Sequence, residues 1–337
     1  MTGPPRETLV LTRRDVTRLL GVRDCIDAVE RAFRMHAAGA AVPPGVLGTH
    51  VAGGGFHVKT AGLLGDERVF VAKVNANFPD NPARRGLPTI QGVIALFDAE
   101  AGRLLAVLDS IAITGLRTAA ASAVAAKYLA REDAGVVAIC GCGEQGRHQL
   151  RALAAVRPLR RALAFDADAA AAARYASEMA AELGIEVAVA DALAPAARAS
   201  DIVVTCTSAR RWLLGRGDVA PGAFVAAVGA DHPEKQEIEP ALLAASTVVA
   251  DVLEQCATIG DLHHALEAGV MTREDVHAEL AEVVAGRKPG RRSADEIVVF
   301  DSTGTALQDV AAAWLVYSRA RASGAGLAVD LGGEGGP

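Results

Sequence analysis

The sequence feature that most constrains the fold is a glycine-rich segment, AGVVAICGCGEQGRHQL, at residues 134–150. A short apolar run, Val136–Cys140, ends at Gly141, and Gly143 and Gly146 complete a Gly-x-Gly-x-x-Gly pattern before helix-forming sequence. In a strand–loop–helix unit the first glycine permits a tight turn, the second lets backbone approach a pyrophosphate, and the third lets the helix pack close to the strand. The N–H groups at the helix start then face the phosphates. The segment therefore predicts a dinucleotide-binding loop.

Strand-like and helix-like patterns alternate from this loop to about residue 305, which favours a parallel, doubly wound sheet. The candidate strands are GVVAIC, RALAFD, IEVAVA, DIVVTCT, AFVAAVG, STVVAD and EIVVFDS. The expected fold class is therefore α/β, with a Rossmann doubly wound parallel sheet.

The flanking regions carry different patterns. A capping box at Thr12 and Asp15 predicts a first helix, and a second is expected at about residues 22–37. Glycines and prolines in residues 38–55 predict turns or short strands, and residues 56–108 predict β-structure. A long alanine-rich helix follows Thr114, and a final helix follows Gly304. We expect residues 326–337 to form a flexible tail because of their composition.

Composition excludes several classes of protein. The net charge is −6 and aromatic residues make up 4% of the chain, with no basic stripe, so nucleic-acid binding has little support. No apolar run reaches the length of a membrane helix, and the N-terminus lacks the apolar core of a signal peptide. The five cysteines are odd in number and lie mostly in apolar runs. We therefore expect reduced thiols, a cytoplasmic location and no membrane partner.

Asp166 ends the second predicted strand of the nucleotide unit, some 20 residues past the loop, where a carboxylate suits the adenine-ribose diol. The next basic residue is Arg174, whereas a 2′-phosphate would favour a closer one. This favours NAD, with NADP as the alternative cofactor. The other interpretation of Asp166 is that it caps the next helix.

Polar residues follow two further predicted strands. Thr205 and Thr207 end one, and Asp231 follows the next. Ligands bind outside the carboxyl ends of strands in open parallel sheets, so these residues should border the cofactor. Asp231 could exchange a proton with a substrate nitrogen, or it could be an ordinary turn aspartate. The pairs His263–His264 and Cys140–Cys142 lack a second cluster to complete a metal site, so no metal is expected.

Five segments, in this order and spacing, resemble the ornithine cyclodeaminase/μ-crystallin family: GLPT (86–89), TGLRTAAASAVAAKYLAR (114–131), GCGEQG (141–146), AVGADHPEKQEIEP (227–240) and EIVVFDSTGTALQDVAAA (296–313). The resemblance covers nearly the whole chain. It implies an NAD(P)-binding Rossmann domain at residues 131–305. It also implies a discontinuous α+β domain for substrate binding and dimerisation, made of residues 1–130 and 306–325, and hence a homodimer.

The resemblance also implies the site residues. The cofactor-binding set is Thr89, Thr118, Gly141, Gly143, Gln145, Gly146, Asp166, Thr205, Thr207, Val228 and Thr303. The family's catalytic lysine, arginine and aspartate correspond to Lys73, Arg117 and Asp231. Arg117 would hold a substrate carboxylate with its guanidinium fork. Lys73 would lie near the reacting nitrogen or help to hold the carboxylate, and Asp231 would act as the acid/base.

One departure concerns the substrate. Ornithine cyclodeaminases of the family supply a second arginine upstream of the lysine, but this chain has none between Arg34 and Arg68. Lys59 could replace that carboxylate contact, although a lysine lacks the planar fork of an arginine. The substitution lowers the expectation of ornithine cyclisation.

The leading hypothesis is therefore an NAD(P)-dependent oxidoreductase that acts on the C–N bond of a small 2-amino or 2-imino acid, as an imine reductase or amino-acid dehydrogenase. The alternative is an ornithine or lysine cyclodeaminase, which forms a cyclic imino acid and ammonia with catalytic NAD. A third possibility is a non-catalytic ligand-binding protein of the μ-crystallin type.

Overall fold

The computed structural model describes residues 7–331. The chain forms two compact units. One unit contains the residues up to Arg117 and those from Thr305 onward, and the other contains Thr118–Gly304. Helix α4 (Ser110–Leu129) is continuous through the first of these divisions. No helix of the described residues is long and apolar enough to cross a membrane.

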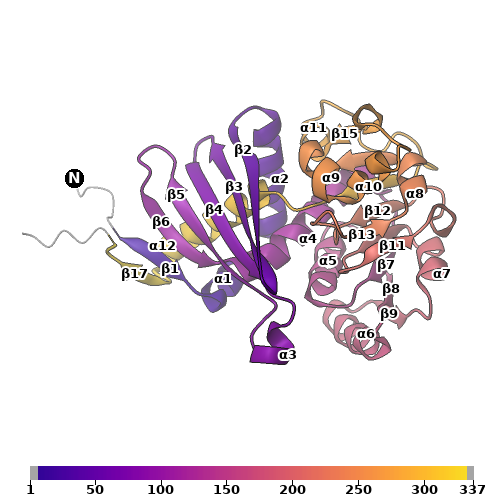
Figure 1. Cartoon of the computed structure of the whole chain (residues 1–337), viewed down its shortest axis with the longest axis horizontal. Helices are drawn as coiled ribbons and strands as arrows, with labels where there is room; N and C mark the ends of the chain where they lie inside the picture. Colours follow the sequence, from indigo (N-terminus) through magenta and orange to yellow (C-terminus); the bar gives the residue numbers. More distant parts are fainter. Residues whose placement is uncertain (1–6, 332–337) are drawn as a thin grey trace, which may run out of the picture. The chain divides into compact units, whose positions relative to one another are not determined.

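The first unit is built on a seven-stranded sheet in the order β17-β1-β6-β5-β4-β3-β2 (Figure 1). Its pairings are antiparallel except for β1 with β6, which is parallel. The strands are β1 (Thr8–Leu11), β2 (Ala41–Val51), β3 (Gly54–Leu64), β4 (Arg68–Asn77), β5 (Ile90–Asp98), β6 (Leu104–Asp109) and β17 (Leu327–Val329). The helices are α1 (Arg13–Leu19), α2 (Val22–Ala37), α3 (Asn81–Arg85), the first part of α4, and α12 (Ala306–Ser323).

Helix α12 is the element around which this unit packs. It packs against α2 and also lies against strands β3 and β4 (Figure 1). Helix α2 is amphipathic and buries Ile26, Val29 and Phe33. The expected capping box of α1 is present, with Thr12 and Asp15 bonded to each other's backbone N–H groups. The C-terminal helix therefore belongs to the same core as the N-terminal segment.

Two expectations for this unit were wrong. Residues Ala41–Val51 form one 11-residue strand instead of turns or short strands. The sheet tolerates the two prolines because β2 is an edge strand whose register shifts between Val42 and Gly45. In the expected tail, residues Leu327–Val329 form β17, because backbone pairing with β1 gives them hydrogen-bond partners that composition does not reveal. Residues 332–337 lie outside the described part of the chain.

The second unit contains an eight-stranded sheet in the order β15-β14-β16-β12-β10-β7-β8-β9, parallel throughout. The strands are β7 (Val136–Cys140), β8 (Arg161–Phe165), β9 (Glu186–Val189), β10 (Ile202–Thr205), β12 (Phe224–Ala227), β14 (Thr247–Ala250), β15 (Ala278–Glu279) and β16 (Val298–Asp301). A separate pair joins β11 (Arg210–Leu214) to β13 (Gln236–Ile238). All seven predicted strands lie in the parallel sheet, so the Rossmann-like fold class is confirmed.

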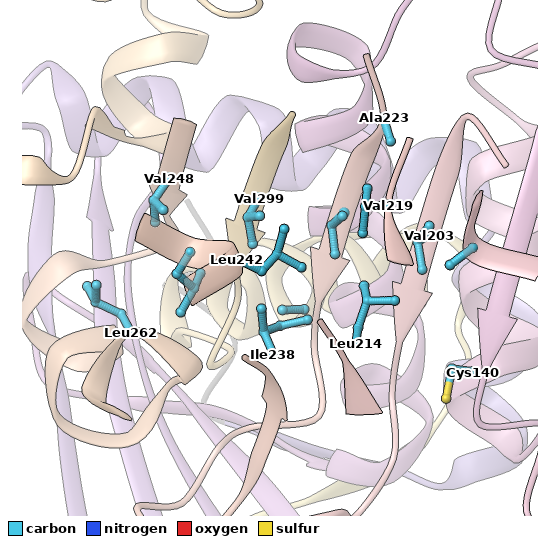
Figure 2. Packing of buried hydrophobic residues seen from close by; sticks show 14 of the residues in the cluster. Cys140, Val203, Leu214, Val219, Ala223, Ile238, Leu242, Val248, Leu262 and Val299 are labelled. Atoms are coloured by element: carbon cyan, nitrogen blue, oxygen red, sulfur yellow. The ribbon is translucent and has the colours of Figure 1, made fainter. Parts of the chain in front are cut away.

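Helices alternate with these strands: α5 (Glu144–Ala154), α6 (Ala169–Leu183), α7 (Leu193–Arg198), α8 (Pro240–Ala244), α9 (Leu253–Ile259), α10 (Asp261–Glu267) and α11 (Leu280–Val284). Side chains from the strands and from α8 and α10 form one buried apolar cluster, which includes Val203, Val299, Leu242 and Leu262 (Figure 2). The strands read as continuous apolar runs because both faces of a parallel sheet are covered.

Candidate functional site

The glycine loop between β7 and α5 has the geometry that its sequence predicts. Gly141 has φ +106°, a conformation that side-chain-bearing residues rarely adopt. A Cβ atom on Gly146 would lie 2.2 Å from the carbonyl oxygen of Gly141, so only glycine lets α5 start this close to the strand. Gly143 is the N-cap of α5, and a Cβ there would meet no described atom within 4 Å. The loop can therefore receive a pyrophosphate at the helix start.

Asp166 follows β8 and binds the glycine loop itself. Its Oδ2 accepts the N–H of Cys142 at 2.8 Å, and its Oδ1 accepts the N–H of Asp168 at 2.9 Å. Helix α6 is capped by Asp168, whose side chain accepts from Ala170. Asp166 therefore lies beside the glycine loop, and Asp168, not Asp166, caps helix α6. The contact of Asp166 with an adenine ribose stays a prediction.

The remaining cofactor candidates of this unit gather at the carboxyl edge of the sheet. Thr205 is the last residue of β10, and Thr207, Val228 and Thr303 come just after the ends of β10, β12 and β16. Because these strands are parallel, all four residues lie at the same edge of the sheet. Gln145, in the first turn of α5, has a buried Nε2 donor with no partner among the described residues. A glycine cradle, a carboxylate and an unused donor form a set that fits a dinucleotide.

Thr118 and Thr89 complete the predicted cofactor set. Thr118 lies on α4 and is 9% exposed. Thr89 belongs to the first unit, between α3 and β5, where its carbonyl accepts the N–H of Phe78.

Glu237 is a buried carboxylate that the sequence analysis quoted in a motif without giving it a role. It lies on β13 and is 0% exposed. Its Oε1 accepts the backbone N–H and the hydroxyl of Thr207 at 2.6 and 2.7 Å, and its Oε2 accepts the N–H of Gly229 at 2.7 Å. Burial raises the pKa of Glu237, while these donors act in the opposite direction.

In the first unit, Lys73 and Arg117 meet on one carboxylate. The Nζ of Lys73 lies 2.6 Å from Oδ2 of Asp309, and the Nε of Arg117 lies 2.9 Å from Oδ1. Strand β4, helix α4 and helix α12 supply these three residues, and all three side chains are buried. The fold therefore joins a cation from residue 73 to one from residue 117 through a carboxylate near the C-terminus.

The charges in this cluster shift each other's protonation. Burial, and after it the positive charge of Arg117, lowers the pKa of the Lys73 ammonium to about 7, while Asp309 acts in the opposite direction. Burial raises the pKa of Asp309, but Arg117 and Lys73 outweigh this effect, so that pKa lies below its usual range. Asp309 is thus held ionised, and Lys73 can gain or lose a proton near neutral pH.

Lys59 extends the cluster. It lies directly opposite Lys73 in the pairing of β3 with β4, and its side chain is 8% exposed. Its charge lowers the pKa of both Lys73 and Asp309, so it lies within electrostatic reach of both. Three cationic side chains therefore surround Asp309, a charge pattern that suits an anionic ligand.

Gln308 precedes Asp309 on α12 and also contacts Arg117. Its Oε1 accepts from Nη1 of Arg117 at 2.6 Å, and the residue is 0% exposed. Its Nε2 has no partner among the described residues. A buried donor without a partner costs free energy, so this amide is suited to a ligand that supplies an acceptor.

Asp231 lies in the other unit, so the structure brings Lys59, Lys73 and Arg117 together but does not place Asp231 relative to them. Its side chain is 53% exposed and forms an ion pair with Lys235 at 2.6 Å. Both interpretations of Asp231, as an acid/base and as a turn residue, therefore stay open.

Sequence reasoning gave no role to Asp309, Gln308 or Glu237. A signal was present, because all three lie inside the segments that carry the family resemblance. Nothing in the sequence alone says that Asp309 meets Lys73, since 236 positions separate them.

Comparisons with known proteins agree with this geometry. A family model described as ornithine cyclodeaminase/mu-crystallin matches residues 6–324. Alanine dehydrogenase of Archaeoglobus fulgidus is 39% identical over 322 residues, covering 95% of this chain and 97% of that protein. A solved archaeal alanine dehydrogenase dimer with bound NAD has a TM-score of 0.92 at 38% identity, over 96% of this chain and 99% of that one. The Δ1-pyrroline-2-carboxylate reductase of Thermococcus litoralis was solved with NADH and L-proline. It has a TM-score of 0.91 at 34% identity, over 96% of this chain and 100% of that one.

Proposed function

The chain belongs to the ornithine cyclodeaminase/mu-crystallin family, and we propose that it acts on the C–N bond of a small 2-amino or 2-imino acid, by reducing the imine or oxidising the amine. It is an NAD-dependent oxidoreductase of this family, of the amino-acid dehydrogenase and imine reductase type. The observation that carries the substrate proposal is the meeting of Lys73 and Arg117 on Asp309 in a buried, cation-rich cluster.

The first role of this cluster is to bind the substrate carboxylate. Arg117 uses Nε for Asp309 and Nη1 for Gln308, and these contacts fix the plane of its guanidinium. A fixed guanidinium can offer its outer edge to a carboxylate at little entropic cost. Lys59 adds a second positive charge, and the Nε2 of Gln308 adds a donor. A small 2-amino or 2-imino acid brings the carboxylate that this set favours.

The second role is proton transfer at the substrate nitrogen. The cofactor, when bound, would supply a hydride to the α-carbon as NADH or accept one as NAD⁺. Lys73, with a pKa of about 7, can exchange a proton at its Nζ or stabilise charge near the nitrogen. We assign to Asp231 the acid/base role on the amine or imine. Asp309 holds Lys73 and Arg117 in place and stays ionised.

We also propose that the protein is a homodimer that pairs through the sheet of the first unit. Leu47, Val58, Val74 and Val93 form one cross-strand row on β2, β3, β4 and β5. Leu47 is 63% exposed, Val74 38% and Val93 46%. Val58 is half-buried between them. An apolar row with three exposed members on neighbouring strands is typical of a protein interface. Light scattering on V74K, compared with the wild type, tests this assignment, and an unchanged dimer mass would refute it.

One assay separates the candidate activities. We expect the purified protein to oxidise NADH stoichiometrically when it is given an imino acid, or a 2-keto acid with ammonium. A cyclodeaminase would instead form proline from ornithine, or pipecolate from lysine, without net change in NADH. That second outcome, with no NADH oxidation in the first assay, would overturn the proposal.

A further inference from the structure

We propose that Glu237 is a positioning residue that clamps together the loops after β10 and β12, and so sets the placement of Thr207 and Asp231 for the reaction. This inference rests on the proposed function, which places the cofactor at this edge and gives Asp231 the acid/base role. Glu237 itself touches neither substrate nor cofactor in this proposal.

The sheet register explains why one carboxylate can hold both loops. Strands β10 and β12 are neighbours, and Thr205 pairs with Ala227 at their carboxyl ends. Thr207 and Gly229 each lie two residues past this pair. Their N–H groups therefore lie near each other, just beyond the ends of the two strands. The Oε1 of Glu237 takes one N–H at 2.6 Å and its Oε2 takes the other at 2.7 Å. Backbone hydrogen bonds also link these segments, from Val228 to the carbonyl of Thr205 at 2.9 Å and from Gln236 to the carbonyl of Ala209 at 3.0 Å. The side chain of Glu237 joins the two loops between those points.

The backbone at Gly229 is adapted to this contact. A Cβ atom on Gly229 would lie 2.5 Å from the carboxylate oxygens of Glu237. A larger residue would push the carboxylate away from the loop that leads to Asp231. The close approach requires both the glycine and the carboxylate, which indicates a fitted pair and not an incidental contact.

Glu237 is itself held by a series of buried carboxylates along the same edge. The Oδ1 of Asp261 accepts the N–H of Glu237 at 2.7 Å, and Asp301 accepts the N–H groups of Asp261 and of the residue after it. Asp251 accepts from the backbone of Gly304 and the hydroxyl of Thr303. The backbone N–H of Asp251 donates to the carbonyl of Asp301 at 2.9 Å, so the series continues to Thr303, a second predicted cofactor residue.

An amide cannot replace this carboxylate. Both oxygens of Glu237 accept from N–H groups, so the NH2 group of a glutamine would face a donor in either orientation. The neighbouring Glu239 differs, because its Oε2 accepts from Arg216 at 2.9 Å and a glutamine oxygen can keep that bond. E237Q and E239Q are therefore a matched pair in one segment of the chain.

The experiment compares these two variants with the wild type after thermal melts have verified folding. We expect E237Q to weaken NADH binding, measured by fluorescence titration with NADH alone, and to lower kcat by on the order of tenfold to a hundredfold. The pH profile of kcat should also change, because the Asp231 loop is released. E239Q should stay within about twofold of the wild type in all three readouts.

Equal NADH affinity, kcat and pH profile in E237Q and E239Q would overturn the proposal. If E237Q does not fold, hydrogen exchange on the wild-type full chain decides. The amides of Thr207 and Gly229 should be protected without any ligand, and rapid exchange of both would overturn the clamp. Failure of the proposed function is recognised separately, because the wild type would then bind NADH and turn over no amino or imino acid.

Discussion

The ammonium of Lys73 and the carboxylate of Asp309 lie 2.6 Å apart in the interior of the first unit, although 236 positions separate them in the sequence. Their side chains are 3% and 0% exposed. A buried ion pair of this kind is stabilising only while both partners are present, since either charge alone would remain desolvated. The pair therefore ties strand β4 to helix α12 in a way that depends on both residues.

Removing the carboxylate should cost more stability than removing an exposed one. We expect D309N to lower the free energy of unfolding by about 3–5 kcal/mol, because Lys73 and Arg117 would lose their shared counter-charge. The control is D24N, whose partner Arg319 lies 2.9 Å away with 38% of its side chain exposed. That variant should lose at most about 1 kcal/mol. Urea unfolding of both variants tests the prediction, and equal losses would contradict it.

The stability of the protein should depend on pH through Lys73. Its pKa in the folded chain is about 7, below the ordinary value of 10.5. Between these two pH values the unfolded chain binds a proton that the folded chain does not, so the contribution of Lys73 to stability rises with pH over this window. We expect the wild type to gain stability relative to K73M as pH increases from 7 to 10.

Urea unfolding of the wild type and K73M at pH 6, 8 and 10 measures this difference. Below pH 7 both states of the wild type are protonated at Lys73, so the difference should be flat there. A difference that stays constant or falls above pH 7 would show that Lys73 is not deprotonated in the folded protein.

Replacing the guanidinium fork of Arg117 should affect substrate binding selectively. We expect R117K to raise KM for the amino or imino acid by on the order of tenfold to a hundredfold, because an ammonium cannot give a planar two-point contact. The affinity for NADH should not change. R319K is the control, since Arg319 pairs with Asp24 on the surface of the same unit. Steady-state kinetics with an NADH titration test this, and a changed NADH affinity with unchanged KM would contradict the assignment.

The glycine loop offers a prediction that is independent of the substrate. In G146A the added Cβ would lie 2.2 Å from the carbonyl oxygen of Gly141, so α5 must move away from the loop. We expect NADH binding to weaken by at least about tenfold. G217A is the control, because a Cβ on Gly217 would meet no described atom within 4 Å. Unchanged NADH affinity in G146A would show that the loop does not bind the cofactor.

The parallel sheet could be predicted because its signals are local. A strand buried on both faces is a short continuous apolar run, and each run in residues 134–305 is followed by helix-forming sequence. The glycines and Asp166 occur at fixed offsets from one strand end, so their geometry also follows from nearby residues. The pairing of strands that are distant in the sequence cannot be predicted from nearby residues. For this reason the sequence analysis did not predict β17, which pairs with β1, or the full length of β2.

The sequence alone determined the glycine loop and the segments that form the strands of the parallel sheet. It also determined the residue types that could bind a dinucleotide or a carboxylate. Only the tertiary structure decided that Lys73 and Arg117 share Asp309, and that Glu237 joins the loops after β10 and β12. The physical reason is that a buried charge is tolerated only beside its partners, and those partners come from elements distant in the chain. Which carboxylate faces which cation is a property of packing, and no local pattern encodes it.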